Sequence, residues 1–220
     1  MTITATEAGR LVRAHRLHVA GAPLADASKV VIFIHGRHAT GTAILPLTEP
    51  LAMDGLCFLA PDADTGSWYP GAFMAPLIPN EPYLTNALDR LGSIYHSLEK
   101  LGFGREQIVL AGFSQGACLV LEYVARHPHF YAGILGFSGG LIGPDPMVRD
   151  DHRSFEGTRI FLGCSEKDPF IPAKRVMETA GHLERHGAQV TARLYPGSDH
   201  IINADQYAHA RAILTWDAVA

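Results

Sequence analysis

The pentapeptide Gly112-Phe113-Ser114-Gln115-Gly116 separates a predicted strand from a predicted helix. Residues 107–111 before it are an apolar run of the kind found in buried strands, and residues 117–126 after it have the pattern of a helix. A turn this tight leaves no room for a Cβ at either glycine, and it presents the Ser114 hydroxyl at the carboxyl edge of a sheet. The N–H groups at the start of the helix can bind an anion there. The stretch therefore predicts a nucleophilic serine in a nucleophile elbow.

A serine in such an elbow needs a base and a carboxylate, and α/β-hydrolases supply them in the chain order Ser, Asp or Glu, His. Two later segments of the chain fit this order. The strand predicted at 159–164 is followed by a polar turn that contains Asp168, and the strand predicted at 190–195 is followed by a turn that ends in His200. Because parallel strands end at a common edge of the sheet, we expect both turns to lie beside the elbow.

Two other acids compete with Asp168 for the role of orienting His200. Asp199 precedes the histidine directly and can hardly turn back toward its ring. Glu166 lies in the same turn as Asp168, but Asp168-Pro169 begins the connection to the next helix. The sequence favours Asp168 and leaves Glu166 as the alternative.

The remaining histidines offer no better base. His182 and His186 lie four residues apart on the helix predicted near 173–187, the spacing of a two-histidine metal site, but no third ligand accompanies them. We therefore expect no metal there, on a helix that we expect to be solvent-exposed on one side. His127 and His129 are interpreted as capping residues at the end of the elbow helix. The histidines without a partner motif are interpreted as solvated: His15, His18, His96, His152 and His209.

A second group of backbone donors is predicted after an early strand. Residues 30–34 form a continuous β-branched and aromatic run, typical of a central strand buried on both faces, and His35-Gly36 follows it. A His-Gly step at this point is where α/β-hydrolases place an oxyanion donor. We expect the N–H groups of Arg37 and Gln115 to converge on the carbonyl oxygen of a substrate.

Several short motifs occur together in one order: Ile34-His35-Gly36, Ser67-Trp68, Gly112-Phe113-Ser114-Gln115-Gly116, Ser138-Gly139-Gly140, Asp168-Pro169 with Ile171-Pro172, and Tyr195-Pro196-Gly197 with His200. In this order, and over most of the chain, they resemble the phospholipase/carboxylesterase family of small α/β-hydrolases, which includes the acyl-protein thioesterases. The resemblance implies a catalytic triad of Ser114, Asp168 and His200, with the N–H groups of Arg37 and Gln115 as the oxyanion hole.

Two departures from the thioesterase branch fall on the rim of the predicted site. That branch has His-Gly-Leu-Gly-Asp after the first buried strand, whereas this chain has His35-Gly36-Arg37-His38-Ala39. The branch also has an acid soon after its Ser-Trp pair, where this chain has Tyr69-Pro70-Gly71. The changes leave the chemistry intact and put specificity for palmitoylated proteins in doubt. The Arg37 guanidinium, placed near the mouth, could favour an ester that bears a carboxylate.

The segment 66–83 differs in composition from the rest of the chain. Apolar side chains alternate there with four prolines, which forbid a regular helix or a central strand. We interpret it as a stiffened loop at the rim of the active site that forms one wall of an acyl or alcohol pocket, with Trp68, Tyr69 and Phe73 as the expected contacts. The alternative is a loop packed back on the core. A second rim loop is predicted at 140–155.

Length and strand pattern indicate one compact domain. The 220 residues are 47% hydrophobic, which is enough for a substantial core. We predict a single α/β-hydrolase domain over 1–220, with a mainly parallel central sheet and helices on both faces. The predicted strands are near 17–19, 30–35, 56–60, 107–113, 133–138, 159–164 and 190–195, and helices are expected near 85–100 and after Asn203.

Charge and cysteine usage restrict the partners. A net charge of −4 and the lack of a Lys/Arg cluster argue against nucleic acid. Residues 1–17 hold no apolar run long enough for a signal peptide or a membrane span. Cys57, Cys118 and Cys164 are interpreted as reduced core thiols, which suits a cytoplasmic protein. No cofactor is expected, and the sequence leaves both a monomer and a homodimer open.

Together these features predict a serine carboxylesterase that hydrolyses short- to medium-chain carboxylic esters, a class of small-molecule substrate. Within enzymes, the alternative is an acyl-protein thioesterase or a lysophospholipase that acts on longer acyl chains. A non-catalytic binding protein on the same scaffold is the alternative of another class. Such proteins usually lose the serine or the histidine, and this chain keeps Ser114 and His200.

Overall fold

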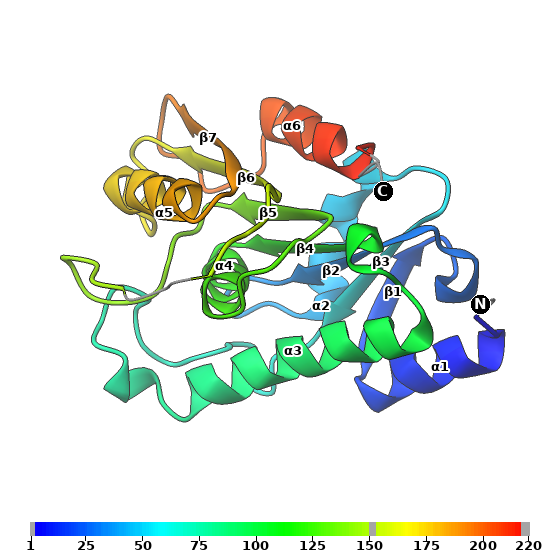
Figure 1. The fold of residues 1–220 in the computed structure, drawn as a ribbon. Coiled ribbons are helices and arrows are strands. Elements are labelled where there is room, and N and C mark those ends of the chain that lie inside the picture. The colour runs from blue at the N-terminus through cyan, green and yellow to red at the C-terminus, as the bar shows by residue number, and fades with distance from the viewer. Residues whose placement is uncertain (1–2, 150–152, 217–220) are drawn as a thin grey trace.

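A computed structural model describes residues 3–149 and 153–216, which form one seven-stranded sheet with helices on both faces (Figure 1). The strand order is β1-β3-β2-β4-β5-β6-β7; β1 runs antiparallel to β3, and every other neighbouring pair is parallel. The seven strands predicted from the sequence are confirmed: β1 (Leu17–Gly21), β2 (Lys29–Ile34), β3 (Leu56–Pro61), β4 (Ile108–Phe113), β5 (Gly133–Phe137), β6 (Arg159–Ser165) and β7 (Gln189–Tyr195).

The central strands are buried on both faces, as their continuous apolar runs predict. In β2, Val30, Ile32 and Ile34 point into one core, while Val31 and Phe33 point into the other. The first core is covered by α1 (Ala5–Ala14), α3 (Tyr83–Leu101), α4 (Gln115–Arg126) and α5 (Ala173–Arg185). The second is covered by α2 (Gly41–Ile44), the 3-10 segment η2 (Leu45–Leu51) and α6 (Ala204–Leu214). Further 3-10 turns are η1 (Leu24–Asp26), η3 (Ile78–Asn80) and η4 (Arg105–Gln107).

Local sequence signals explain where several helices begin and end. The α1 helix, which the apolar pattern did not indicate, is started by a capping box in which Thr4 and Glu7 satisfy each other's backbone N–H. The predicted cap of α6 is present, because the Asn203 side chain accepts a hydrogen bond from Gln206 N at 2.9 Å. The α3 helix is capped after Leu101 by Gly102, whose φ of 110° lies in the left-handed region that favours glycine.

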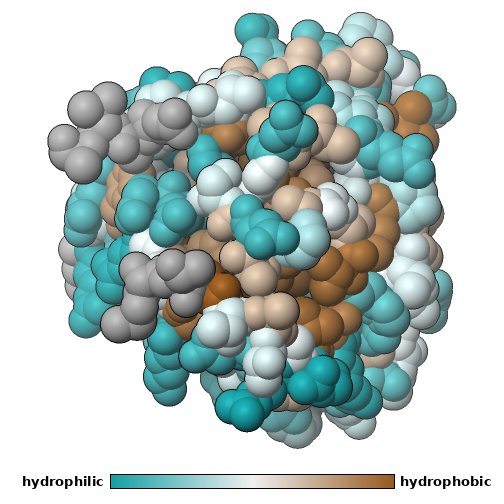
Figure 2. Space-filling model, turned by 90° about the vertical axis from the view of Figure 1, so that its right-hand side faces the viewer, coloured by the Kyte–Doolittle hydropathy of each residue, from teal (hydrophilic) through white to brown (hydrophobic). Residues whose placement is uncertain are grey.

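The two ends of the described chain lie on the same side of the molecule, at the right of Figure 1. Figure 2 shows this side as a mixed surface, on which hydrophobic residues are visible between hydrophilic ones. Among the described residues, no helix is both long and apolar enough to cross a membrane.

Candidate active site

The candidate nucleophile sits in a strained turn between β4 and α4. Ser114 has φ 56° and ψ −121°, a conformation that a non-glycine residue adopts rarely. A Cβ on Gly112 would lie 2.4 Å from the carbonyl carbon of Gly116, and a Cβ on Gly116 would lie 2.1 Å from the Ile34 oxygen. Both glycines of the pentapeptide are therefore required by close backbone approach, as a nucleophile elbow demands.

His200 is hydrogen-bonded to Asp168 across the ends of β6 and β7. Its Nδ1 lies 2.7 Å from Asp168 Oδ2. The other carboxylate oxygen, Oδ1, accepts hydrogen bonds from the N–H groups of Phe170 at 2.9 Å and Ile171 at 3.0 Å. The carboxylate is fully buried, and the histidine side chain is 17% exposed. This arrangement fixes which oxygen of Asp168 faces the imidazole.

The environment of Asp168 keeps the carboxyl ionised. Burial acts to raise its pKa, but the hydrogen bonds from His200, Phe170 and Ile171 outweigh burial and lower the pKa below the usual value. The competing acids lie elsewhere: Glu166 and Asp199 are exposed, and the backbone oxygen of Asp199 accepts a hydrogen bond from Ser165 Oγ at 2.6 Å.

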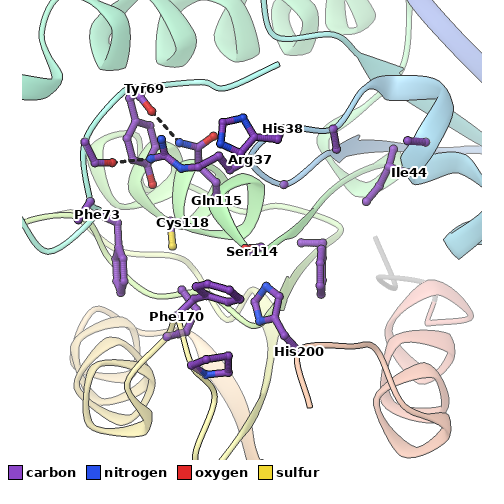
Figure 3. Close-up of a pocket in the computed structure, with 18 of the residues that line it drawn as sticks. Arg37, His38, Ile44, Tyr69, Phe73, Ser114, Gln115, Cys118, Phe170 and His200 are labelled. Carbon is purple, nitrogen blue, oxygen red and sulfur yellow. Dashed lines mark hydrogen bonds between the residues drawn. The ribbon is translucent and has the colours of Figure 1, made fainter. Parts of the chain in front are cut away.

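Two aromatic rings pack against the imidazole. The Phe113 ring, next to the elbow, has its centroid 4.8 Å from that of His200, and the Phe170 ring lies edge-on at 5.0 Å. Figure 3 shows the His200 ring beside Ser114, with both residues at one cavity. The elbow serine and the Asp–His pair, predicted from three distant segments, therefore meet at one place.

The predicted oxyanion residues lie at the same cavity. Gln115 is the first residue of α4, so its N–H has no partner within the helix. Arg37 follows Gly36, and Gly36 packs so closely that a Cβ there would lie 3.3 Å from Ser114 Cβ. Arg37 and Gln115 both line the cavity beside the serine.

His35 is a buried support for this loop. Its Nδ1 lies 2.7 Å from Gly36 O, and its Nε2 accepts a hydrogen bond from Ala63 N at 3.0 Å, so the proton is on Nδ1. Burial lowers the pKa of its imidazole, which favours this neutral form. The His35 carbonyl accepts a hydrogen bond from the Trp68 indole at 2.9 Å, and the two rings pack with centroids 4.9 Å apart.

The predicted wall residues divide into two groups. Tyr69 and Phe73 line the cavity, whereas Trp68 is not among its lining residues and lies behind the wall against His35. All three side chains are less than one tenth exposed and belong to the core. The segment 66–83 therefore fits both interpretations made from the sequence, because it forms one wall of the cavity and also packs on the hydrophobic core. Of the second predicted rim loop, residues 150–152 lie outside the described structure, and the rest of 140–155 does not line the cavity.

The cavity has a volume of about 790 Å³, and most of its lining is apolar. Several of the side chains that form it were not predicted from the sequence. They include Ile44, Leu47, Phe113, Cys118, Phe170 and Ile171. Phe170 and Ile171 could have been found, because they directly follow the Asp168-Pro169 motif in a turn at the catalytic edge.

The three cysteines are buried and free, as predicted. Burial raises the pKa of the Cys118 thiol to about 12, and Gly140 N donates a hydrogen bond to its sulfur at 3.5 Å. Cys118 is therefore a neutral thiol at the cavity floor, one helical turn from Ser114, and not a competing nucleophile.

The interpretation of the other histidines as solvated was incomplete. His15 pairs with Ser97 at 2.9 Å, His18 with Asp62 at 2.8 Å, and the His209 ring stacks on Phe161 at 5.0 Å. The sequence could not reveal these partners, because most are far away in the chain. The Nδ1 atom of His96 lies 2.6 Å from Gly92 O in its own helix, and His152 lies outside the described residues. His182, on the helix expected to be exposed on one side, is buried. Within the described ranges, no three His, Cys, Asp or Glu side chains are grouped for a metal ion.

Comparison with known proteins agrees with the motifs. Residues 18–215 match the model of the phospholipase/carboxylesterase family. A phospholipase/carboxylesterase structure from Dyadobacter fermentans is 39% identical, with a TM-score of 0.85, over 90% of this chain and 96% of that one.

Two curated relatives are more distant in sequence. The acyl-protein thioesterase 1 of Gibberella zeae is 28% identical over 84% of this chain and 88% of its own. The protein of the same name from Saccharomyces cerevisiae is 27% identical over 84% and 91%. Because the family match spans nearly the whole sequence, the chain belongs to the phospholipase/carboxylesterase family of α/β-hydrolases.

Proposed function

We propose that this protein is a serine carboxylesterase that hydrolyses short- to medium-chain carboxylic esters through an acyl-enzyme. The observation that carries the proposal is the hydrogen bond of 2.7 Å between Asp168 and His200, at a cavity that also holds the elbow serine Ser114. Membership of the phospholipase/carboxylesterase family supports the reaction class.

In the first half of the reaction, Ser114 Oγ attacks the ester carbonyl while His200 Nε2 takes the hydroxyl proton. The tetrahedral intermediate collapses, the carbon–oxygen bond to the alcohol breaks, and His200 returns the proton to the leaving oxygen. In the second half, water gives a proton to His200 and attacks the acyl carbon. Ser114 then leaves with that proton, and the carboxylic acid is released.

The geometry supports a role for each of the other groups in this proposal. Because Asp168 Oδ2 is 2.7 Å from Nδ1, it holds the tautomer that leaves Nε2 as the basic nitrogen, and its negative charge stabilises the imidazolium. In this proposal, the N–H groups of Arg37 and Gln115 bind the oxyanion. Each such donor contributes about 3–4 kcal/mol to transition-state stabilisation in related sites. The proposed steps need no cofactor.

The lining of the cavity supports a short or medium acyl group. The rings of Tyr69, Phe73 and Phe170 are part of this lining, and rigid aromatic walls leave less space for a long flexible chain. Its volume of about 790 Å³ is within the usual range of small-molecule sites.

A thioesterase is the second candidate, favoured by the names of the two curated relatives. A series of p-nitrophenyl esters from acetate to palmitate, with palmitoyl-coenzyme A as the thioester, separates the two functions. We expect kcat/KM to peak at a short or medium chain and to vanish in Ser114→Ala. A preference for palmitate or the thioester would favour the second candidate, and no hydrolysis of any member would contradict both.

A further inference from the structure

The loop that forms one wall of the cavity is held by the side chains of the two proposed oxyanion residues. Residues 68–71 belong to no helix or strand, so their backbone groups need other partners. Gln115 Oε1 accepts a hydrogen bond from Trp68 N at 3.0 Å, and Gln115 Nε2 donates to Tyr69 O at 2.8 Å. Arg37 binds the next two residues of the loop.

The Arg37 guanidinium donates hydrogen bonds to two successive backbone carbonyl groups. Its Nη1 donates to Pro70 O at 2.7 Å and its Nη2 donates to Gly71 O at 2.5 Å, and the guanidinium carbon lies 5.9 Å from the centroid of the Tyr69 ring (Figure 3). Only arginine offers two such donors in one rigid plane. Both terminal nitrogens of the guanidinium are therefore used in hydrogen bonds to the wall loop. This argues against the role that we predicted from the sequence, in which the guanidinium binds a carboxylate of the substrate.

Asn80 binds the backbone of the same part of the loop. Its fully buried amide accepts a hydrogen bond from Gly71 N at 2.6 Å and donates to Ala72 O at 3.2 Å. A Cβ on Gly71 would lie 2.7 Å from Asn80 Oδ1, so the glycine is needed for this close approach. The cavity residues Tyr69 and Phe73 directly precede and follow the segment 70–72 that Arg37 and Asn80 bind.

We propose that the Arg37 side chain is a specificity-determining positioning residue, which clamps the Tyr69–Phe73 wall and thereby limits the length of the acyl group. The inference rests on the proposed esterase function. Arg37 would then serve the substrate twice: its N–H binds the carbonyl oxygen, and its guanidinium holds the wall that meets the acyl chain. Without the guanidinium, the Tyr69–Phe73 wall would be displaced more easily, and the cavity would accept esters with longer acyl chains.

The test compares Arg37→Leu and Arg37→Lys with the unmodified protein by the ratio of kcat/KM for p-nitrophenyl decanoate to that for butyrate. If a substitution only weakened the oxyanion hole, it would lower kcat/KM for both esters by the same factor, and the ratio would not change. We expect Arg37→Leu to raise the ratio by about tenfold or more, the lower end of the range over which pockets discriminate a single methylene group. Arg37→Lys should raise it nearly as much, because one ammonium group cannot span two carbonyls.

Arg211→Leu is the matched control. Arg211 also donates to a backbone carbonyl, Pro50 O at 2.9 Å, but it does not line the cavity. This variant should leave the ratio unchanged. Amide hydrogen exchange gives a second readout that does not depend on turnover. Exchange at the amides of Trp68, Tyr69, Gly71 and Ala72 should be faster by about tenfold in Arg37→Leu, because local opening becomes easier, and should be unchanged in Arg211→Leu.

The results separate the inference from the function on which it rests. An unchanged ratio and unchanged exchange in Arg37→Leu, in a protein whose Ser114 is labelled and whose esters are cleaved, would overturn the clamp and leave the esterase. A ratio that changes in Arg37→Leu but not in Arg37→Lys would assign the effect to charge and also overturn the clamp. Failure of the unmodified protein to cleave any ester would overturn both.

Discussion

The Phe170 ring meets the His200 imidazole edge-on, with centroids 5.0 Å apart and planes at 73°. The Phe170 N–H also donates to Asp168 Oδ1 at 2.9 Å. One residue thus contacts both members of the Asp–His pair, the acid through its backbone and the imidazole through its ring. Phe170 is 65% exposed, so its ring contributes little to the hydrophobic core. Its main contact is with the candidate active site.

Phe170→Ala should separate these two contacts, because it keeps the N–H and removes the ring. We expect kcat for p-nitrophenyl butyrate to fall by about tenfold, since small displacements of a catalytic group are costly. Thermal unfolding should change little, because the ring buries little area. Phe170→Leu should recover part of the lost kcat. An alanine variant with full kcat would show that His200 is held without the ring.

Asp168→Asn and Glu166→Gln form a matched pair that tests the choice of acid. Asparagine at 168 cannot hold the same tautomer of His200, so kcat should fall by about 10²–10⁴-fold. Glutamine at 166 should leave kcat within about twofold of the unmodified value, because surface substitutions have small effects. Steady-state kinetics on one ester decides between them. A greater loss in the glutamine variant would transfer the role to Glu166.

The lowered pKa of Asp168 predicts how stability depends on pH. A carboxyl whose pKa is lower in the folded than in the unfolded protein stabilises the fold above its unfolded pKa of about 3.9. That contribution is lost as the pH falls through the folded value. The difference in unfolding free energy between the unmodified protein and Asp168→Asn should therefore be greatest near neutral pH and should shrink in acid. Urea denaturation at several pH values measures it, and a difference independent of pH would contradict the prediction.

Trp68 and Phe73 should respond differently to truncation, although both belong to the predicted wall. Trp68 lies behind the wall with its indole bonded to His35 O, so Trp68→Ala should lower the unfolding free energy by about 3–5 kcal/mol. Phe73 lines the cavity, so Phe73→Ala should raise kcat/KM for long acyl esters relative to short ones. Denaturation and ester kinetics on both variants test this. A shift of chain preference in Trp68→Ala without loss of stability would contradict the placement.

Much of the fold follows from signals that are local in the sequence. The strands were visible as short apolar runs, and the elbow was visible because two glycines are forced by close backbone approach around Ser114. Asp168 and His200 could be placed because each follows a strand of one parallel sheet. The α1 helix was missed because its start depends on a capping box at Thr4 and not on a long apolar stripe.

The parts that could not be predicted depend on contacts between distant residues. Nothing near Arg37 in the sequence indicates that its guanidinium binds Pro70 and Gly71, more than thirty positions away. Trp68 and Tyr69 are adjacent in the chain, yet only Tyr69 reaches the cavity, because the loop turns the indole toward His35. Composition identifies such a loop as apolar and stiff, but it does not tell which side chains face inward.

The central claim is that Ser114 is acylated during turnover, and covalent labelling tests it most directly. The native protein is treated with a fluorophosphonate, digested, and analysed by mass spectrometry. We predict a single adduct on Ser114, no adduct in Ser114→Ala, and a fall of several orders of magnitude in ester hydrolysis by that variant. An adduct on another serine, or undiminished hydrolysis by Ser114→Ala, would contradict the account.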